Sequence, residues 1–112
     1  MSGAPQIDTS EVRDRPGRFA VGVIGTGRVG SVLGAALARA GHRVVAASAV
    51  SDRSRRRAAE LLPDVPLLPP PEVAEQAELL LLGVPDDVLP ELVVGLADAG
   101  LFRPGQTVLH PS

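Results

Sequence analysis

The sequence predicts an α/β fold, a doubly wound parallel sheet with helices on both faces. Short apolar runs of strand length alternate with segments of helical periodicity along most of the chain. The first run, "FAVGVI", is typical of a strand covered on both faces, and a glycine cluster follows it directly. Right-handed crossovers between such strands favour the strand order 3-2-1-4-5.

Five strands are expected, at residues 19–24, 43–48, 65–68, 77–84 and 107–110. The third, "VPLL", has the weakest signal and the fourth, "AELLLLGV", has the strongest. In the predicted order, the winding of the sheet reverses between the first and fourth strands. A ligand is therefore expected in the crevice beyond the carboxyl ends of these two strands.

Four helices are expected between the strands. The first begins at Arg28, and Gly41 stands where a glycine in the left-handed conformation would end it. Its apolar face is formed by Val29, Val32, Leu33, Ala36 and Leu37. The second begins at a capping residue, Ser51 or Asp52, and stops before Pro63. A short third helix begins near Pro71.

The fourth helix is expected to begin at a capping carboxylate, because Asp86 and Asp87 stand directly before a periodic apolar segment. Pro90 is acceptable there since it falls in the first turn. The apolar face of this helix consists of Val88, Leu89, Leu92, Val93 and Leu96.

Length and composition bound the organisation of the chain. A chain of 112 residues with 45% apolar residues forms at most one domain with a real core. Residues 1–17 lack the apolar segment of a secretory signal and are expected to be a flexible leader before a domain at 18–112. No apolar run approaches the ~20 residues that span a bilayer, so no membrane partner is expected. The absence of cysteine is compatible with a cytoplasmic protein.

Charge and missing residue types exclude several functions. The net charge of −2 gives no electrostatic reason to expect nucleic acid. All 11 basic residues are arginine, and the chain has neither tyrosine nor tryptophan. A Walker-type phosphate loop needs a lysine, so a nucleoside triphosphatase of this type is excluded. A short-chain dehydrogenase is excluded as well, because it needs a Tyr-Lys pair. The two histidines lie far apart, and no metal site is expected.

The glycine cluster forms a G-x-G-x-x-G pattern between the first strand and the first helix. Gly25 permits a tight turn, Gly27 leaves room for a diphosphate, and Gly30 lets the helix pack closely on the strand. The helix N-terminus offers unpaired N–H groups to the anion. We therefore expect a dinucleotide to bind at residues 25–30, which include Thr26, Arg28 and Val29. Gly34, one turn further, is expected to serve packing alone.

The residues after the second strand favour NADP as the dinucleotide, with NAD as the alternative. An NAD site places an acid about 20 residues after the glycines, and Asp52 is the only acid there. A 2′-phosphate instead needs hydroxyl and guanidinium donors, which are supplied by Ser51, Arg53, Ser54 and Arg55. Arg56 and Arg57 fit better on a solvated helix face.

Three segments carry a family resemblance: "VGVIGTGRVGSVLGAALARAGHRVV", "ELLLLGVPDDVL" and "QTVLHPS". Together they resemble the N-terminal Rossmann domain of proteins with a DUF2520 C-terminal domain. That group is similar to 6-phosphogluconate-dehydrogenase-like, ketopantoate-reductase-like and pyrroline-5-carboxylate-reductase-like enzymes and to F420-dependent NADP reductases. The resemblance covers residues 18–112. It implies a helical C-terminal domain that completes the substrate site and mediates dimerisation, so residues 1–112 alone are expected to be inactive.

The same resemblance implies roles for residues at the ends of the fourth and fifth strands. Val84, Pro85 and Asp86 would line the ribose and diphosphate of the cofactor. His110 and Ser112 would lie near the nicotinamide, where His110 is the candidate catalytic residue because imidazole exchanges protons near neutral pH. A polar strand end without catalytic function is the alternative for His110. His42 is expected to stabilise a helix end instead.

Three functions follow from these features. The first is the NADP-binding domain of an oxidoreductase that reduces a small carbonyl or imine, of which ketopantoate is one instance. The second is a non-catalytic module that senses NAD(P) and adjusts a partner domain. The third, a methyltransferase that binds S-adenosylmethionine, is disfavoured because the glycine spacing and the arginines suit a phosphorylated ligand.

Overall fold

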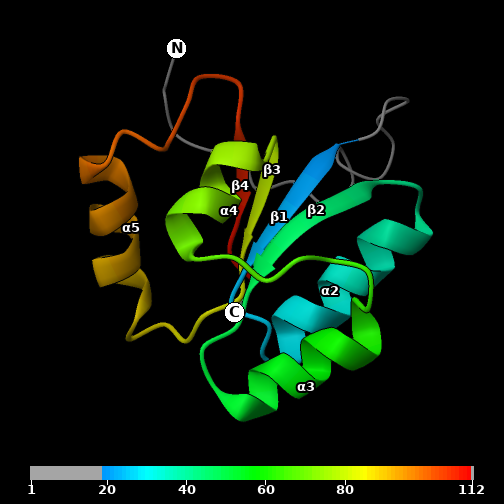
Figure 1. Cartoon of the computed structure of the whole chain (residues 1–112). Helices are drawn as coiled ribbons and strands as arrows, with labels where there is room; N and C mark the ends of the chain where they lie inside the picture. The colour runs from blue at the N-terminus through cyan, green and yellow to red at the C-terminus, as the bar shows by residue number, and fades with distance from the viewer. Residues whose placement is uncertain (1–18, 112) are drawn as a thin grey trace.

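A computed structural model of the chain describes residues 19–111, so the expected leader, Arg18 and Ser112 lie outside the described residues. The elements, in chain order, are β1 (Ala20–Ile24), α2 (Arg28–Arg39), β2 (Arg43–Ser48), α3 (Asp52–Leu61), α4 (Pro70–Gln76), β3 (Leu79–Leu82), α5 (Leu89–Asp98) and β4 (Thr107–Leu109). Figure 1 shows the strands side by side at the centre, with helices around them. Among residues 19–111, no helix has the length and hydropathy that a membrane-spanning helix needs.

The strands form one parallel sheet in the order β2-β1-β3-β4. This arrangement confirms the predicted α/β fold and the predicted order of these four strands. The prediction of a third strand at residues 65–68 is wrong. This segment is reduced to a single parallel bridge between Leu67 and Ala47, at the predicted edge beside β2. Because Pro66 and Pro69 have no N–H group, they cannot donate to the rest of a ladder.

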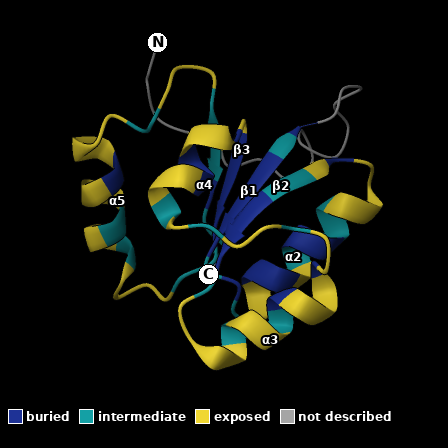
Figure 2. Ribbon diagram, in the orientation of Figure 1, coloured by how far each residue is buried: buried dark blue, intermediate teal, exposed yellow. Residues whose placement is uncertain are grey.

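Alternate residues of the strands build two cores, one on each face of the sheet. Val21, Val23 and Leu81 face the cluster that includes Ala35 of α2 and Leu62, which follows α3. Ile24 and Leu82 face the other cluster, with α4 and α5. Figure 2 shows β1 and β3 almost entirely buried and the outer helix faces exposed. Burial on both faces explains why the strand sequences are almost entirely apolar.

Small residues form the buried face of α2. The residues of α2 that are buried are Gly30, Ser31, Gly34 and Ala35. The predicted face is therefore wrong in part, because Val29 is 47% and Val32 50% exposed. A Cβ on Gly34 would lie 3.2 Å from Val23 Cγ2, so its predicted packing role is confirmed. Close approach of helix to sheet selects small side chains over large apolar ones here.

The helix ends follow the expected chemistry, with one exception. Gly41 has φ +100°, and the N–H groups of Gly41 and His42 donate to Ala38 and Leu37, which confirms the predicted left-handed end of α2. Ser51 Oγ caps α3 by accepting the N–H of Ser54. α4 begins at Pro70, one residue before the predicted start.

The predicted cap of α5 is wrong. Its N-cap is Val88, and no side chain caps the helix. The carbonyl oxygen of Pro85 instead accepts the N–H groups of Val88 and Leu89, so a turn over residues 86–88 displaces both aspartates from the cap position. Pro90 does fall in the first turn. Leu96 is the buried residue of the predicted face, whereas Val88 and Val93 are exposed.

Two side chains from the segment before β4 form hydrogen bonds with the C-terminal end of α4. The guanidinium of Arg103 donates to the carbonyl oxygens of Glu75, at 2.7 Å, and Ala77, at 2.6 Å. Gln106 Nε2 donates to the carbonyl oxygen of Ala77 as well, at 3.0 Å. These bonds satisfy carbonyl groups that the helix leaves unpaired at its C-terminus.

His42 connects the end of α2 to the residue before β1. Its buried Nδ1 accepts the N–H of Phe19 at 3.1 Å, and the two rings lie 5.3 Å apart. This contact agrees with a structural role for His42.

Candidate functional site

Glycine residues from two loops meet at the carboxyl ends of β1 and β3. Gly25 has φ +89°, and a Cβ on it would lie 2.7 Å from the carbonyl oxygen of Gly83. A Cβ on Gly30 would collide with the carbonyl oxygen of Gly25. Both of these neighbouring atoms belong to the backbone, so a side-chain rotation cannot relieve either clash. Gly25 therefore permits the turn, and Gly30 permits close packing of helix and strand, as predicted.

Gly83 belongs to the same contact, and the sequence pattern did not single it out. A Cβ on Gly83 would lie 2.5 Å from the carbonyl oxygen of Gly25 and 2.8 Å from the Cα of Gly30. The signal available in the sequence was a glycine directly after the most apolar strand, but its partner lies far away in the chain. This contact brings the loops after β1 and β3 together at the point where the winding of the sheet reverses.

Gly27 differs from these three glycines because no atom of the described chain would clash with a Cβ at this position. The nearest atom to a Cβ built on Gly27 is the carbonyl oxygen of Gly83, at 4.0 Å. Gly27 is the N-cap residue of α2, no side chain caps this helix, and its first turn contains no acidic residue. The turn therefore leaves a helix N-terminus suited to an anion, with room at Gly27 for its close approach.

Ser48 and Thr26 tie this turn to the end of β2. Ser48 is 3% exposed, and its Oγ accepts the N–H of Gly25 at 3.0 Å. Thr26 is fully buried, and its one hydroxyl hydrogen is shared between the carbonyl oxygens of Ser48, 3.3 Å from Oγ1, and Ser54, 3.1 Å from Oγ1. Thr26 was predicted as a cofactor-binding residue. Because its side chain is buried, only its backbone is in a position to meet a ligand.

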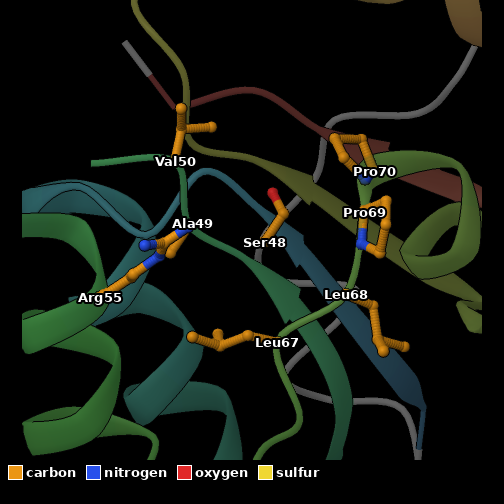
Figure 3. A pocket seen from close by; sticks show the side chains of 8 residues that line it. All are labelled: Ser48, Ala49, Val50, Arg55, Leu67, Leu68, Pro69 and Pro70. Carbon is orange, nitrogen blue, oxygen red and sulfur yellow. The ribbon is translucent and has the colours of Figure 1, made fainter. Parts of the chain in front are cut away.

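A first cavity, of about 390 Å³, opens beyond the end of β2. It is lined by Ser48, Ala49, Val50, Arg55, Leu67, Leu68, Pro69 and Pro70. Figure 3 shows Arg55 extending toward Ala49 from one side, with Pro69 and Pro70 across from it. The cavity combines an apolar wall with one guanidinium group, which suits a flat base joined to an anionic group.

The other residues predicted to hold a 2′-phosphate lie next to this cavity in the first turn of α3. Ser51 Oγ and Ser54 Oγ are 2.9 Å apart and share one hydrogen bond. One of the two hydroxyl hydrogens is used in that bond, so the pair has one left for a ligand. Arg53 is exposed, as is Asp52, the acid of the NAD alternative.

A second cavity, of about 380 Å³, lies on the other side of the glycine turn. It is lined by Gly27, Arg28, Val29, Gly83, Val84, Pro85, Asp86 and Pro111. The structure thus brings the predicted residues of both loops, from Gly27 to Val29 and from Val84 to Asp86, around one space.

His110 has partners that the sequence did not reveal. Its Nε2 lies 3.3 Å from the carbonyl oxygen of Val84 and 3.6 Å from Oδ1 of Asp86. The side chain of His110 is 18% exposed and that of Asp86 is 78% exposed. Both partners are acceptors, so in the neutral ring Nε2 carries the hydrogen and Nδ1 carries the lone pair.

Within residues 19–111, no three histidine, cysteine, aspartate or glutamate side chains gather as metal ligands would. The geometry that the described residues do form is the glycine turn, residues 25–30, with a cavity on each side.

The family model for the Rossmann-like domain matches residues 3–112. The chain belongs to the Rossmann-like domain family. No curated protein matches it.

Solved structures show the same Rossmann-like fold. A Bacteroides fragilis protein assigned as an NADP oxidoreductase has a TM-score of 0.68 at 24% identity, over 85% of this chain and 36% of that one. A semialdehyde dehydrogenase NAD-binding protein of Cupriavidus necator, in complex with calcium and NAD, has a TM-score of 0.69 at 21% identity, over 84% and 33%. An NADH-preferring ketol-acid reductoisomerase of an uncultured archaeon has a TM-score of 0.68 at 22% identity, over 93% and 31%.

This Rossmann-like chain spans about a third of the length of each of these solved structures. At these identities, the likeness shows the fold. The narrower resemblance to proteins with a DUF2520 domain stays a prediction.

Proposed function

We propose that the chain is the NADP-binding domain of an oxidoreductase that reduces a small carbonyl or imine substrate. The observation that carries this proposal is the uncrowded backbone of Gly27 at the uncapped N-terminus of α2. The other glycines of the turn are required by the protein's own backbone, as the contacts of Gly25, Gly30 and Gly83 make clear. At Gly27 the nearest backbone atom is 4.0 Å from the Cβ position, so the fold itself does not require glycine at this uncapped helix N-terminus, and a ligand that approaches the backbone closely would.

The residues present fit a dinucleotide on both sides of this turn. The diphosphate would meet the N–H groups at the start of α2, where neither a cap nor an acid competes for them. The adenosine would lie in the cavity with Val50, Pro69 and Arg55, and the nicotinamide in the cavity with Val84 and Pro111. The three solved structures, whose descriptions name NADP, NAD and NADH, support a dinucleotide and leave the choice open.

The end of β2 favours NADP within this proposal. An NAD site needs an acid there to accept from the ribose hydroxyl groups. In this chain the last residue of β2 is Ser48, which is buried and bonded to Gly25. Arg55 and the serine pair at the start of α3 supply donors for a 2′-phosphate instead. We retain NAD as the alternative, with Asp52 as its acid.

On the nicotinamide side, the bound cofactor would supply a hydride, and this chain would supply position and proton exchange. His110 is the proposed catalytic residue. With Nε2 directed at Val84 and Asp86, Nδ1 is the ring atom that remains for a substrate. Asp86 would keep the ring in this orientation, as a carboxylate does for other catalytic histidines.

Calorimetric titration with NADPH, NADH and S-adenosylmethionine tests the proposal. We expect NADPH to bind most tightly, at one site, and S-adenosylmethionine not to bind. Tighter binding of NADH would overturn the NADP assignment, and binding of S-adenosylmethionine alone would overturn the oxidoreductase.

Reduction itself is tested with the natural protein that contains this domain. We expect it to oxidise NADPH in the presence of 2-keto acids or imines. Tight NADPH binding without turnover across a broad substrate panel would instead establish the sensing module.

A further inference from the structure

The buried hydroxyl of Thr26 has no access to a ligand, yet it joins two parts of the proposed cofactor site. Its single hydrogen is shared between two acceptors, the carbonyl oxygen of Ser48 at the end of β2 and that of Ser54 in the first turn of α3. We infer that Thr26 is a specificity-positioning residue, which fixes the 2′-phosphate donors of α3 relative to the glycine turn. This inference rests on the proposed function and assigns a role within the same site.

The contacts of Thr26 run between segments that would hold different ends of the cofactor. Gly25, directly before Thr26, belongs to the turn that would hold the diphosphate. Ser54 belongs to the turn of α3 that carries Arg55. A ligand with a 2′-phosphate must meet both segments at once, whereas one without it depends mainly on the glycine turn.

Ser48 strengthens the same connection from β2. Its Oγ accepts the N–H of Gly25, while its carbonyl oxygen accepts from Thr26 Oγ1. The residue at the usual place of an NAD-binding acid is therefore used to hold the turn in place. Because Thr26 is fully buried and Ser48 nearly so, water does not readily replace these hydrogen bonds.

The test compares the affinities of NADPH and NADH in Thr26→Val, which keeps the shape of the side chain and removes the hydroxyl. Loss of one buried hydrogen bond corresponds to a change of about fivefold. We expect NADPH to bind about fivefold more weakly, NADH to change less than twofold, and Thr26→Ser to restore the preference. The matched control is Ser31→Ala, which should leave the ratio of the two affinities unchanged, since buried Ser31 directs its hydroxyl to Gly27 and Arg28 at the start of α2 and not to α3.

If the affinities for NADPH and NADH fell by the same factor, or if neither changed, the role of Thr26 would be overturned and the proposed function would stand. If the unaltered chain bound neither nucleotide, the proposed function would fail and the role of Thr26 with it. A second experiment needs no variant, so it remains valid if Thr26→Val does not fold.

In the unaltered chain, adenosine 2′-monophosphate, which has no diphosphate, should shift the amide NMR signals of Gly25 and Thr26 together with those of residues 51–55. Shifts confined to residues 51–55 would contradict the connection.

Discussion

Gly83 and Gly25 lie in such close contact that a Cβ on Gly83 would stand 2.5 Å from the Gly25 carbonyl oxygen. The loops after β1 and β3 therefore approach each other with only hydrogen atoms between their backbones. This contact shapes the turn that faces the proposed cofactor. Because it involves main-chain atoms, neither loop can relieve a larger side chain by rotating a bond.

Gly83→Ala should destabilise the fold by about 1–3 kcal/mol, as overpacking does in a well-packed interior. Urea unfolding measures this change. The control is Gly95→Ala, because Gly95 lies in α5 with no atom within 4 Å of its Cβ position. That variant should gain about 0.5–1 kcal/mol in stability, since alanine favours a helix interior. If Gly83→Ala left the free energy of unfolding unchanged, the two loops would not be held in this contact.

Gly27→Ala should separate ligand binding from folding. Its Cβ would meet no atom of the chain closer than 4.0 Å, so the midpoint of thermal unfolding should stay within a few degrees. NADPH affinity, measured by calorimetry, should fall by at least tenfold, because the methyl group occupies the path of the diphosphate. Unchanged affinity would mean that the space at Gly27 is not where the ligand binds.

Arg55→Ala should weaken NADPH binding by about tenfold or more, the usual worth of a hydrogen bond to a charged group. NADH affinity should remain unchanged, since NADH has no 2′-phosphate. Arg56 provides the comparison because it is exposed on the same helix and does not line the cavity. A larger effect at Arg56 than at Arg55 would place the phosphate elsewhere.

Arg103→Met should lower the free energy of unfolding by about 1.5–3 kcal/mol, because the guanidinium bonds the carbonyl groups of Glu75 and Ala77. Chemical denaturation checks this value. Arg103→Lys keeps the positive charge but loses the planar guanidinium, so its stability should lie between that of the unaltered chain and that of Arg103→Met. Equal stability of the lysine and arginine proteins would show that charge alone holds α4.

The neutral ring of His110 should carry its hydrogen on Nε2, since both neighbouring groups, the Val84 carbonyl and the Asp86 carboxylate, accept hydrogen bonds. Nitrogen-15 NMR of the imidazole distinguishes the two tautomers directly. A ring protonated on Nδ1 would remove the proposed path for proton exchange at that atom.

Local patterns in the sequence were sufficient for the parts of the fold that depend on local physics. The tight turn at Gly25 and the left-handed end of α2 at Gly41 were predicted, and both glycines have the positive φ angles that other residues rarely adopt. The strand order followed from the alternation of elements. Residues 65–68 were misread because their apolar character predicted a ladder that prolines leave without donors.

What the sequence could not show depends on contacts between distant segments. Apolar periodicity pointed to Val29 and Val32 of α2, yet close packing on the sheet selects the smaller side chains. The pairing of His110 with Asp86 joins two loops that only the fold brings together. The burial of Thr26 was equally invisible, because a threonine between two glycines reads as an exposed loop residue.

The most direct measurement is an amide NMR titration of the chain with NADPH. If the glycine turn holds the diphosphate, the largest shifts should fall on residues 27–30, where α2 begins without a cap. Saturating shifts at these amides, accompanied by shifts at residues 51–55, are the predicted result. Binding that leaves the amides of residues 27–30 unmoved would contradict the proposal that a dinucleotide occupies this turn.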